Sequence, residues 1–213
     1  MSQMSDYLED AIRNYFKGSA FPAVPVDELI ALYTAAPSDS GGGTEVVNAV
    51  GYVRVPIAVG GWTSGGAGSG SISNTAAITF PAATGAGWGT ITHVGVFDDL
   101  AVAGGGNTTL AADPALGATN FKVTAVTNFN VGDWVRIDTA GNREYRRITA
   151  VGTAGSGGTG IDVDTATLID HANGVAFTEV GNLLMWGALT ASKVVGASDI
   201  FQFAAGALAL SFA

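Results

Sequence analysis

The chain has 213 residues, of which 47% are hydrophobic and only 13% charged. This length can bury one core, or one core with a smaller domain attached. Nine Lys and Arg against eighteen Asp and Glu give a formal net charge of −9, which excludes a protein that tracks nucleic-acid phosphates. Cysteine is absent, so disulfides, thiolate catalysis, zinc–thiolate sites and iron–sulfur clusters are excluded too.

The apolar residues are dispersed along the chain. No run is long enough to predict a membrane-spanning helix, and the first residues lack the basic and apolar regions of a signal peptide. With 31 glycines and few charges, the surface must be solvated by Thr, Ser and Gly or covered by neighbouring molecules. The second option is typical of an assembly protein.

The sequence predicts a helix over 5–17. Its apolar side chains fall on one stripe, made of Tyr7, Leu8, Ala11, Ile12, Tyr15 and Phe16. Ser5 is placed to cap the start, Gly18 to end the helix, and Glu9 to pair with Arg13. We expect the stripe to pack on its own domain; the alternative is an arm that docks on a partner.

Short apolar segments separated by glycine-rich turns predict strands through the rest of the first and last parts of the chain. The predicted strands are 28–34, 51–59, 73–80, 89–98, 182–189, 200–203 and 207–212, with Pro56 marking an edge or a bulge and 60–70 forming a flexible loop. This pattern indicates a mainly β base domain, a sandwich or barrel, with a short N-terminal helix.

A second pattern lies between these two parts. It begins at Gly104–Gly106 and holds five of the nine cations, namely Lys122, Arg136, Arg143, Arg146 and Arg147. Its predicted strands are 121–126, part of 129–137, 144–151 and 160–164. The sequence therefore predicts a base domain of 1–103 plus 179–213, interrupted by a small inserted β domain of 104–178.

No combination of residues predicts catalysis or a cofactor. His93 lies within a predicted strand and is expected to be a packed or interface histidine. His171 lies near Asp162 and Asp164, which could hold calcium, but the spacing matches no calcium loop and a solvated strand face is favoured. The run 65–70 lacks the lysine and helix of a phosphate loop. We assign no catalytic, cofactor or metal site, and leave open whether 104–178 binds a ligand.

Tryptophans are the remaining candidates for a binding surface. Trp62 and Trp88 lie in glycine-rich stretches, which are usually exposed, and are the candidate partner interface. Trp134 and Trp186 lie in apolar strands and are expected in the core.

Several motifs in order carry a resemblance to a known family. They are Thr-Ala-Ala-Pro-Ser-Asp (34–39), Gly-Tyr-Val-Arg-Val (51–55), Ser-Asn-Thr-Ala-Ala-Ile-Thr-Phe-Pro-Ala-Ala (73–83), Trp-Gly-Thr-Ile-Thr-His-Val-Gly-Val-Phe-Asp (88–98), Asn-Leu-Leu-Met-Trp-Gly-Ala-Leu-Thr (182–190) and Phe-Ala-Ala-Gly-Ala-Leu (203–208). The series resembles small virion proteins of tailed bacteriophages, often labelled tail fibre proteins. The resemblance covers 1–103 and 179–213. Family members connect the strand that ends in Val-Phe-Asp to the strand that contains Leu-Leu-Met-Trp by a short turn, whereas this chain has the insert 104–178 there. The insert is itself similar to small β modules of phage surface proteins.

The resemblance implies a structural virion protein that is not an enzyme. We expect a capsid decoration, or cement, protein that binds the major capsid protein on the assembled head lattice. The alternative is a tail fibre or tail-tip component that recognises a host receptor or surface glycan. A glycan hydrolase is the weakest hypothesis, because no acid–base pair is evident. We further expect a homo-oligomer, a dimer or trimer, in a virion assembled in the host cytoplasm.

Overall fold

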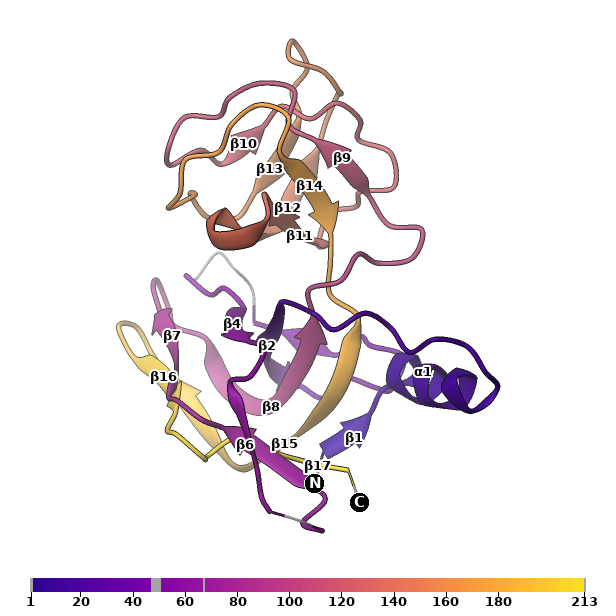
Figure 1. Ribbon diagram of the computed structural model, residues 1–213. Helices are drawn as coiled ribbons and strands as arrows, with labels where there is room; N and C mark the ends of the chain where they lie inside the picture. Colours follow the sequence, from indigo (N-terminus) through magenta and orange to yellow (C-terminus); the bar gives the residue numbers. More distant parts are fainter. Residues whose placement is uncertain (1, 47–50, 67, 213) are drawn as a thin grey trace. The chain divides into compact units, whose positions relative to one another are not determined.

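The computed structural model describes residues 2–46, 51–66 and 68–212, and most of the regular structure in them is strand (Figure 1). The prediction of a mainly β chain with a short N-terminal helix is confirmed. The chain forms two compact units. Unit 1 is Met1–Asp99 with Asn182–Ala213, and unit 2 is Leu100–Gly181. The predicted insert was 104–178; that it folds as a domain of its own stays a prediction.

The main sheet of unit 1 has the strand order β1-β15-β8-β2-β3, and β4 also pairs with β2. These strands are β1 (Ser2–Met4), β2 (Asp27–Ala35), β3 (Thr44–Glu45), β4 (Val55–Ala58), β8 (Gly89–Asp98) and β15 (Leu183–Val195). The stretch 29–33 of β2 and the stretch 94–97 of β8 are buried on both faces, which explains why these stretches are apolar without alternation.

Two smaller sheets complete unit 1. One pairs β7 (Ile78–Ala82) with β16 (Ile200–Phe203), and the other has the order β17-β6-β5, with β5 (Trp62–Ser64), β6 (Ser71–Asn74) and β17 (Ala209–Ser211). Aromatic rings from several of these segments pack together in the core. Phe80 lies 6.1 Å from Tyr52 and from Trp88 and 5.8 Å from Phe201, measured between ring centres.

Unit 2 contains one antiparallel sheet of order β10-β13-β12-β11-β14-β9 among its described strands. The strands are β9 (Asn107–Thr109), β10 (Asn120–Phe121), β11 (Trp134–Ile137), β12 (Glu144–Val151), β13 (Ile161–Val163) and β14 (Ala176–Glu179), and a short 3-10 turn spans Ala140–Asn142. Its core is built on Phe121, Phe129 and Phe177, and the Phe177 ring contacts both of the others.

The chain enters and leaves unit 2 along two neighbouring segments. Ala101 and Val180 form an antiparallel bridge, the Val102 N–H donates to the Glu179 carbonyl at 3.1 Å, and the Gly181 N–H donates to the Leu100 carbonyl at 3.3 Å. The two ends of unit 2 are therefore held side by side.

Several predicted strands differ from those observed. The segment 73–80 is not one strand, because Asn74 turns the chain: its amide donates to the carbonyls of Ala76 (2.7 Å) and Ala204 (2.9 Å) and accepts from the Leu208 N–H (2.8 Å). β6 ends there, and β7 joins another sheet. The loop predicted over 60–70 contains β5, which pairs with β6.

The alternating segment 121–126 overlaps β10 only at Phe121, and Val123 forms an isolated bridge with Leu110. The strand predicted over 182–189 extends to Val195. Both differences come from pairing with distant strands, which alternation within a short segment does not reveal.

Candidate partner interface

Helix α1 (Asp6–Phe16) is fixed to unit 1 at its first turn. Ser5 has an extended backbone, and its hydroxyl accepts from the Leu8 N–H at 3.2 Å, as a capping residue should. The Ser5 N–H donates to the Leu184 carbonyl (3.0 Å), the Ser5 hydroxyl donates to the Leu183 carbonyl, and the Asp6 N–H donates to the Asp39 carbonyl (2.9 Å). The predicted cap is confirmed, and it also attaches the helix to β15.

Tyr7, in the first turn of α1, is hydrogen-bonded to Asp98 at the end of β8. Burial, followed by the charge and the hydrogen bond of Asp98, raises the pKa of the Tyr7 hydroxyl. Asp98 is buried, and its carboxylate also accepts from the Asn182 backbone N–H (2.9 Å) and side-chain amide (3.0 Å). The start of α1 is therefore anchored by groups from both chain segments of unit 1.

The outer turns of α1 lack such contacts. None of the residues Asp6–Phe16, all of which are described, is buried. Tyr15 is 59% exposed, Phe16 84% and Phe21, in the segment after the helix, 49%. The Tyr15 ring centre lies 6.0 Å from that of Phe16 and 6.3 Å from that of Phe21, both edge to face. The expectation that the whole stripe packs on its own domain is wrong for these turns.

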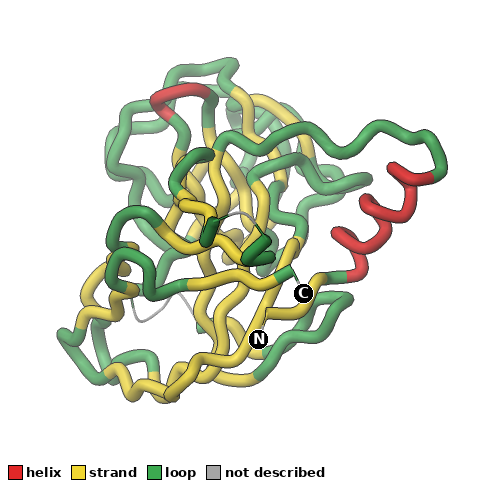
Figure 2. The backbone as a smooth tube through the Cα atoms, turned by 60° about the horizontal axis from the view of Figure 1, so that its bottom comes forward, coloured by secondary structure: helices red, strands yellow, loops and turns green. Residues whose placement is uncertain are grey.

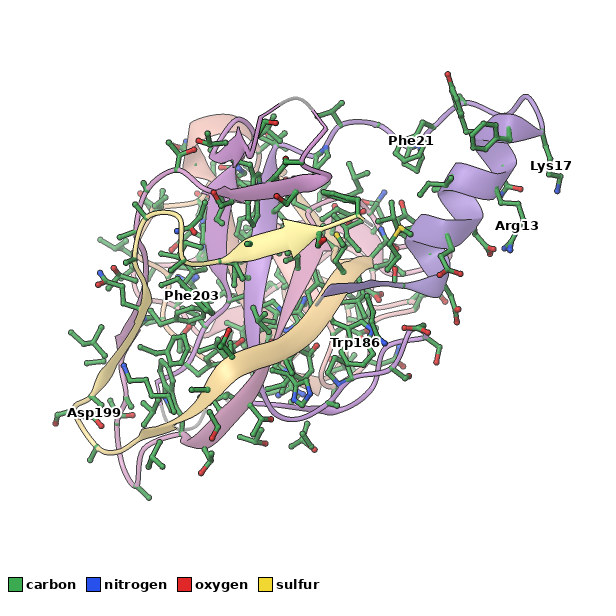
Figure 3. All side chains as sticks on the ribbon, turned by 90° about the horizontal axis from the view of Figure 1, so that it is seen from below. Arg13, Lys17, Phe21, Trp186, Asp199 and Phe203 are labelled. Carbon is green, nitrogen blue, oxygen red and sulfur yellow. The ribbon has the colours of Figure 1, made fainter. Side chains whose placement is uncertain are left out.

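We call residues 11–26 the arm. Figures 2 and 3 show α1 at the periphery of unit 1, followed by a long connection to β2. Gly18 ends the helix with a φ of 91°, as predicted. The arm continues with exposed Val24 and Val26. Its charged residues are Arg13 and Lys17 alone; Arg13 pairs with Asp10 rather than with the predicted Glu9.

A hollow of about 470 Å³ lies elsewhere on unit 1, between β15 and the segments of β16 and β17. Its apolar lining includes Phe201, Phe203, Leu208 and Leu210. Lys193 is the charged residue of the lining: its Nζ donates to the Ile200 carbonyl (3.3 Å) and lies 5.2 Å from the centre of the Phe201 ring. The hollow thus offers apolar walls and a cation.

The hollow adjoins an open edge of the main sheet. On that edge β15 pairs with β1 only at Met185, Trp186 and Gly187, among the described residues. Farther along, the register with β8 shifts between Ala188 and Lys193, so β15 bulges where it lines the hollow. Bulges of this kind keep an edge from pairing with foreign strands, so the apolar walls, rather than the backbone, are the surface available to a partner.

Three of the four tryptophans differ in exposure from what their sequence context suggested. Trp88 is 5% exposed and packs edge to face on Tyr52, so the expectation of an exposed Trp88 is wrong. Trp62 is half-buried, and its Nε1 donates to Glu28 Oε2 at 2.5 Å. Trp134 is buried as expected, whereas Trp186 is half-buried, donates to Asp39 (3.0 Å) and lines the hollow. A partner role for Trp62 stays a prediction.

The residues considered for calcium have separate partners. Asp162 accepts from the Asn120 amide (2.5 Å), Asp164 accepts from the Thr165 N–H (2.7 Å), and His171 is buried beside Glu144. In the part of the chain that the structure describes, no three ligating side chains come together as a metal would require. His93 is half-buried, with Nδ1 2.8 Å from the Thr92 hydroxyl and its ring 6.1 Å from that of Trp186.

The most connected polar group of unit 2 is Glu144. Its carboxylate accepts from the N–H groups of Leu168 (2.8 Å) and Ile169 (3.1 Å), from Arg146 Nη2 (2.5 Å) and from His171 Nε2 (2.9 Å). Burial alone would raise the pKa of this carboxyl, but these donors outweigh it and lower the pKa. The cluster holds the loop before β14 and is structural.

Sequence reasoning gave a docking arm only as the alternative for the helix over 5–17, did not extend it to Phe21, and missed the hollow. Phe21 is followed by Pro22 and Pro25, which prevent a regular element that could bury its ring, and this signal was available. The hollow had no local signal, because its walls come from segments that are far apart along the chain.

None of the described helices is long and apolar enough to cross a bilayer. A search of curated proteins gives no match for this chain. The model of the family described as Podophage GP4 fiber I protein gp80 matches residues 3–141. The match contains the arm, and it continues past the boundary of unit 1 into unit 2, as far as the 3-10 turn. Because it covers more than half of the chain, the protein belongs to this family of phage fibre proteins.

Proposed function

We propose that this chain is a fibre component of a podophage virion and acts by binding other virion proteins and the host surface, without catalysis. The observation that carries the proposal is the match of residues 3–141 to the fibre I family. The low charge of the chain and the uncovered apolar surface of the arm agree with it, since both suit a protein that is covered by neighbours.

The sequence alone favoured capsid decoration over a fibre role. The family description names a fibre protein, and it therefore supports the alternative, a tail fibre or tail-tip component. Binding to the major capsid protein has no support from the family, and we favour attachment to other fibre or tail components instead.

We assign assembly and recognition to different units. The matched range includes the arm and most of the first chain segment of unit 1, whereas 142–181 of unit 2 lie beyond it. Assembly into the virion is assigned to unit 1. Unit 2, with loops that expose Leu116, Val131 and Leu168, is assigned to contact with a host receptor or surface glycan.

Immunogold labelling of intact virions tests the proposal. Antibody raised against unit 2 should label the tail region or fibres, and prior incubation with the purified chain should abolish the label. Dense label over the head would support capsid decoration and overturn the fibre role. Particles that carry no label, although the purified chain binds the same antibody, would contradict a virion component altogether.

A further inference from the structure

We infer that the peptide bond between Lys17 and Gly18 is a proteolytic cleavage site, open in the folded chain to an endopeptidase that cuts after a basic residue. Cleavage adds one water molecule to this bond and leaves a carboxylate on Lys17 and an amino group on Gly18. The two pieces stay assembled, and the segment after the cut becomes an arm with a free end. The inference does not rest on the fibre role, because it concerns the chain by itself.

The bond lies in an open part of unit 1. Lys17 follows the last residue of α1 and is exposed, and Figure 3 shows it at the outer end of the helix. A Cβ added to Gly18 would meet no atom within 4 Å, so the space beside the bond is free. Residues 20–25, all of which the structure describes, have no polar side chain and make no hydrogen bond within the chain. An enzyme can therefore approach from the side of the connection.

Only the last turn of α1 must open before the bond is cut. The backbone N–H groups of Lys17 and Ser19 donate to the Asn14 carbonyl, each at 3.0 Å. The Gly18 N–H donates to the Tyr15 carbonyl, also at 3.0 Å. No residue of the helix is buried, so opening this turn exposes no core. Segments with so few buried contacts open at low free energy, and proteases cut the opened form.

The other basic residues are protected from such an enzyme. Arg13 is exposed but lies inside α1 and pairs with Asp10. Lys193 is exposed but lies inside β15, which pairs it and the next two residues with β8. The rest of the nine are buried or half-buried, namely Arg54, Lys122, Arg136, Arg143, Arg146 and Arg147. Lys17 therefore combines a basic side chain with exposure and a position outside the strands and the helix.

The aromatic residues of the arm offer a poorer site. Phe21 is followed by Pro22, which has a fixed φ and no N–H, so an enzyme that cuts after aromatic residues does not accept this bond. Tyr15 and Phe16 lie within α1, whereas Lys17 follows it. The exposed segment therefore selects an enzyme of basic specificity.

The piece before the cut is held to unit 1 without the connection. β1 pairs with β15, and the first turn of α1 is bonded to β15, to the end of β8 and to the Asp39 carbonyl. These contacts all come from residues 2–7. On the far side of the connection, the Val26 N–H donates to the Asp99 carboxylate at 2.9 Å. Cleavage therefore leaves both pieces in place and frees residues 18–25 at one end.

Limited digestion of the folded full chain with trypsin, read by mass spectrometry, tests the site. The first cut should fall after Lys17, and the two pieces should elute together in gel filtration and separate only in denaturant. Lys17→Gln should lose this cut and stay whole over the same time. Lys193→Gln is the matched control, because it removes another exposed lysine and should be cut as the wild type is. Far-UV circular dichroism checks that both variants are folded.

Three results would overturn the inference. The first is a wild type whose first cut falls elsewhere, or that stays whole until it unfolds. The second is a folded Lys17→Gln chain that is cut as fast as the wild type, since the basic side chain would then not define the site. The third is a pair of pieces that separate in gel filtration without denaturant, which would show that the connection is needed to hold β1 and α1 in place.

Discussion

Units 1 and 2 each hold a buried arginine paired with a glutamate, but the two pairs hold different parts of the fold. In unit 1, Arg54 donates twice to Glu45 (2.8 and 2.9 Å) and lies 3.7 Å from the centre of the Phe97 ring. The Tyr52 hydroxyl donates to Glu45 (3.0 Å) and accepts from the Leu32 N–H (2.9 Å). This pair fixes the segment before β4 to β2.

In unit 2 the corresponding carboxylate holds a loop. Glu144 on β12 accepts two backbone N–H groups, of Leu168 and Ile169, besides its bonds to Arg146 and His171. Every partner named for Glu45 lies in unit 1, and every partner named for Glu144 lies in unit 2. Each unit therefore has its own hydrogen-bonded Glu–Arg cluster in addition to its own core. We expect a substitution in one cluster to destabilise only the unit that contains it.

Glu144→Gln should have the largest effect. It removes the carboxylate that is hydrogen-bonded to the buried Arg146 and weakens the acceptor of two loop N–H groups. Breaking a buried ion pair costs about 3–5 kcal/mol. Hydrogen exchange read by mass spectrometry should show faster exchange throughout unit 2 and unchanged exchange in unit 1. Asp170→Asn, an exposed acid in the same loop, is the control. An equal increase of hydrogen exchange in both units would show that the two Glu–Arg clusters do not stabilise their units separately.

The effect of Glu144→Gln should also depend on pH. Because the folded-state pKa of Glu144 lies below its ordinary value of 4.5, its stabilisation is complete above that value and is lost as the pH falls through the folded pKa. Urea unfolding of wild type and variant should therefore differ most at neutral pH and converge in acid. Burial raises the pKa of Asp164 and of Glu179, so these two groups change the free energy of unfolding with pH in the opposite sense to Glu144. Their contribution is common to wild type and variant, so the quantity to measure is the difference in the free energy of unfolding between the two proteins. A difference in the free energy of unfolding that grows as the pH falls would contradict the stabilising role of the Glu144 carboxylate.

Tyr52→Phe should have a smaller effect, confined to unit 1. It removes the acceptor of the buried Leu32 N–H and one donor to Glu45, while the ring can keep its contacts with Phe80 and Trp88. An unsatisfied buried donor costs about 1–3 kcal/mol. Urea unfolding measures the loss, and Tyr15→Phe, which alters an exposed hydroxyl on the arm, serves as the control. A loss no greater than that of the control would show that Tyr52 contributes by packing alone.

Strands with a local signal could be predicted from the sequence. The segments 89–98, 144–151 and 200–203 coincide with β8, β12 and β16, since each is rich in β-branched or aromatic residues and is bounded by turns. The start and the end of α1 were predictable because Ser5 and Gly18 act through their own neighbours.

Features made by distant residues could not be predicted. Asn74 ends β6 through bonds to Ala204 and Leu208. Glu144 finds three of its partners, Leu168, Ile169 and His171, more than twenty residues away. Trp88 was expected on an exposed loop because glycines surround it, but the rings of Tyr52 and Phe80 cover it. The hollow has the same origin, as strands from separate segments form its walls.

The central claim, that unit 1 is a complete fold interrupted by unit 2, is tested most directly by deleting 105–178. The Ala101–Val180 bridge holds the two ends side by side, so a short turn can rejoin them. Far-UV circular dichroism with thermal melting is the measurement. The account predicts a β-rich spectrum and a cooperative melt for the shortened chain. A disordered spectrum, with no cooperative transition, would show that unit 1 needs unit 2 to fold and would contradict the account.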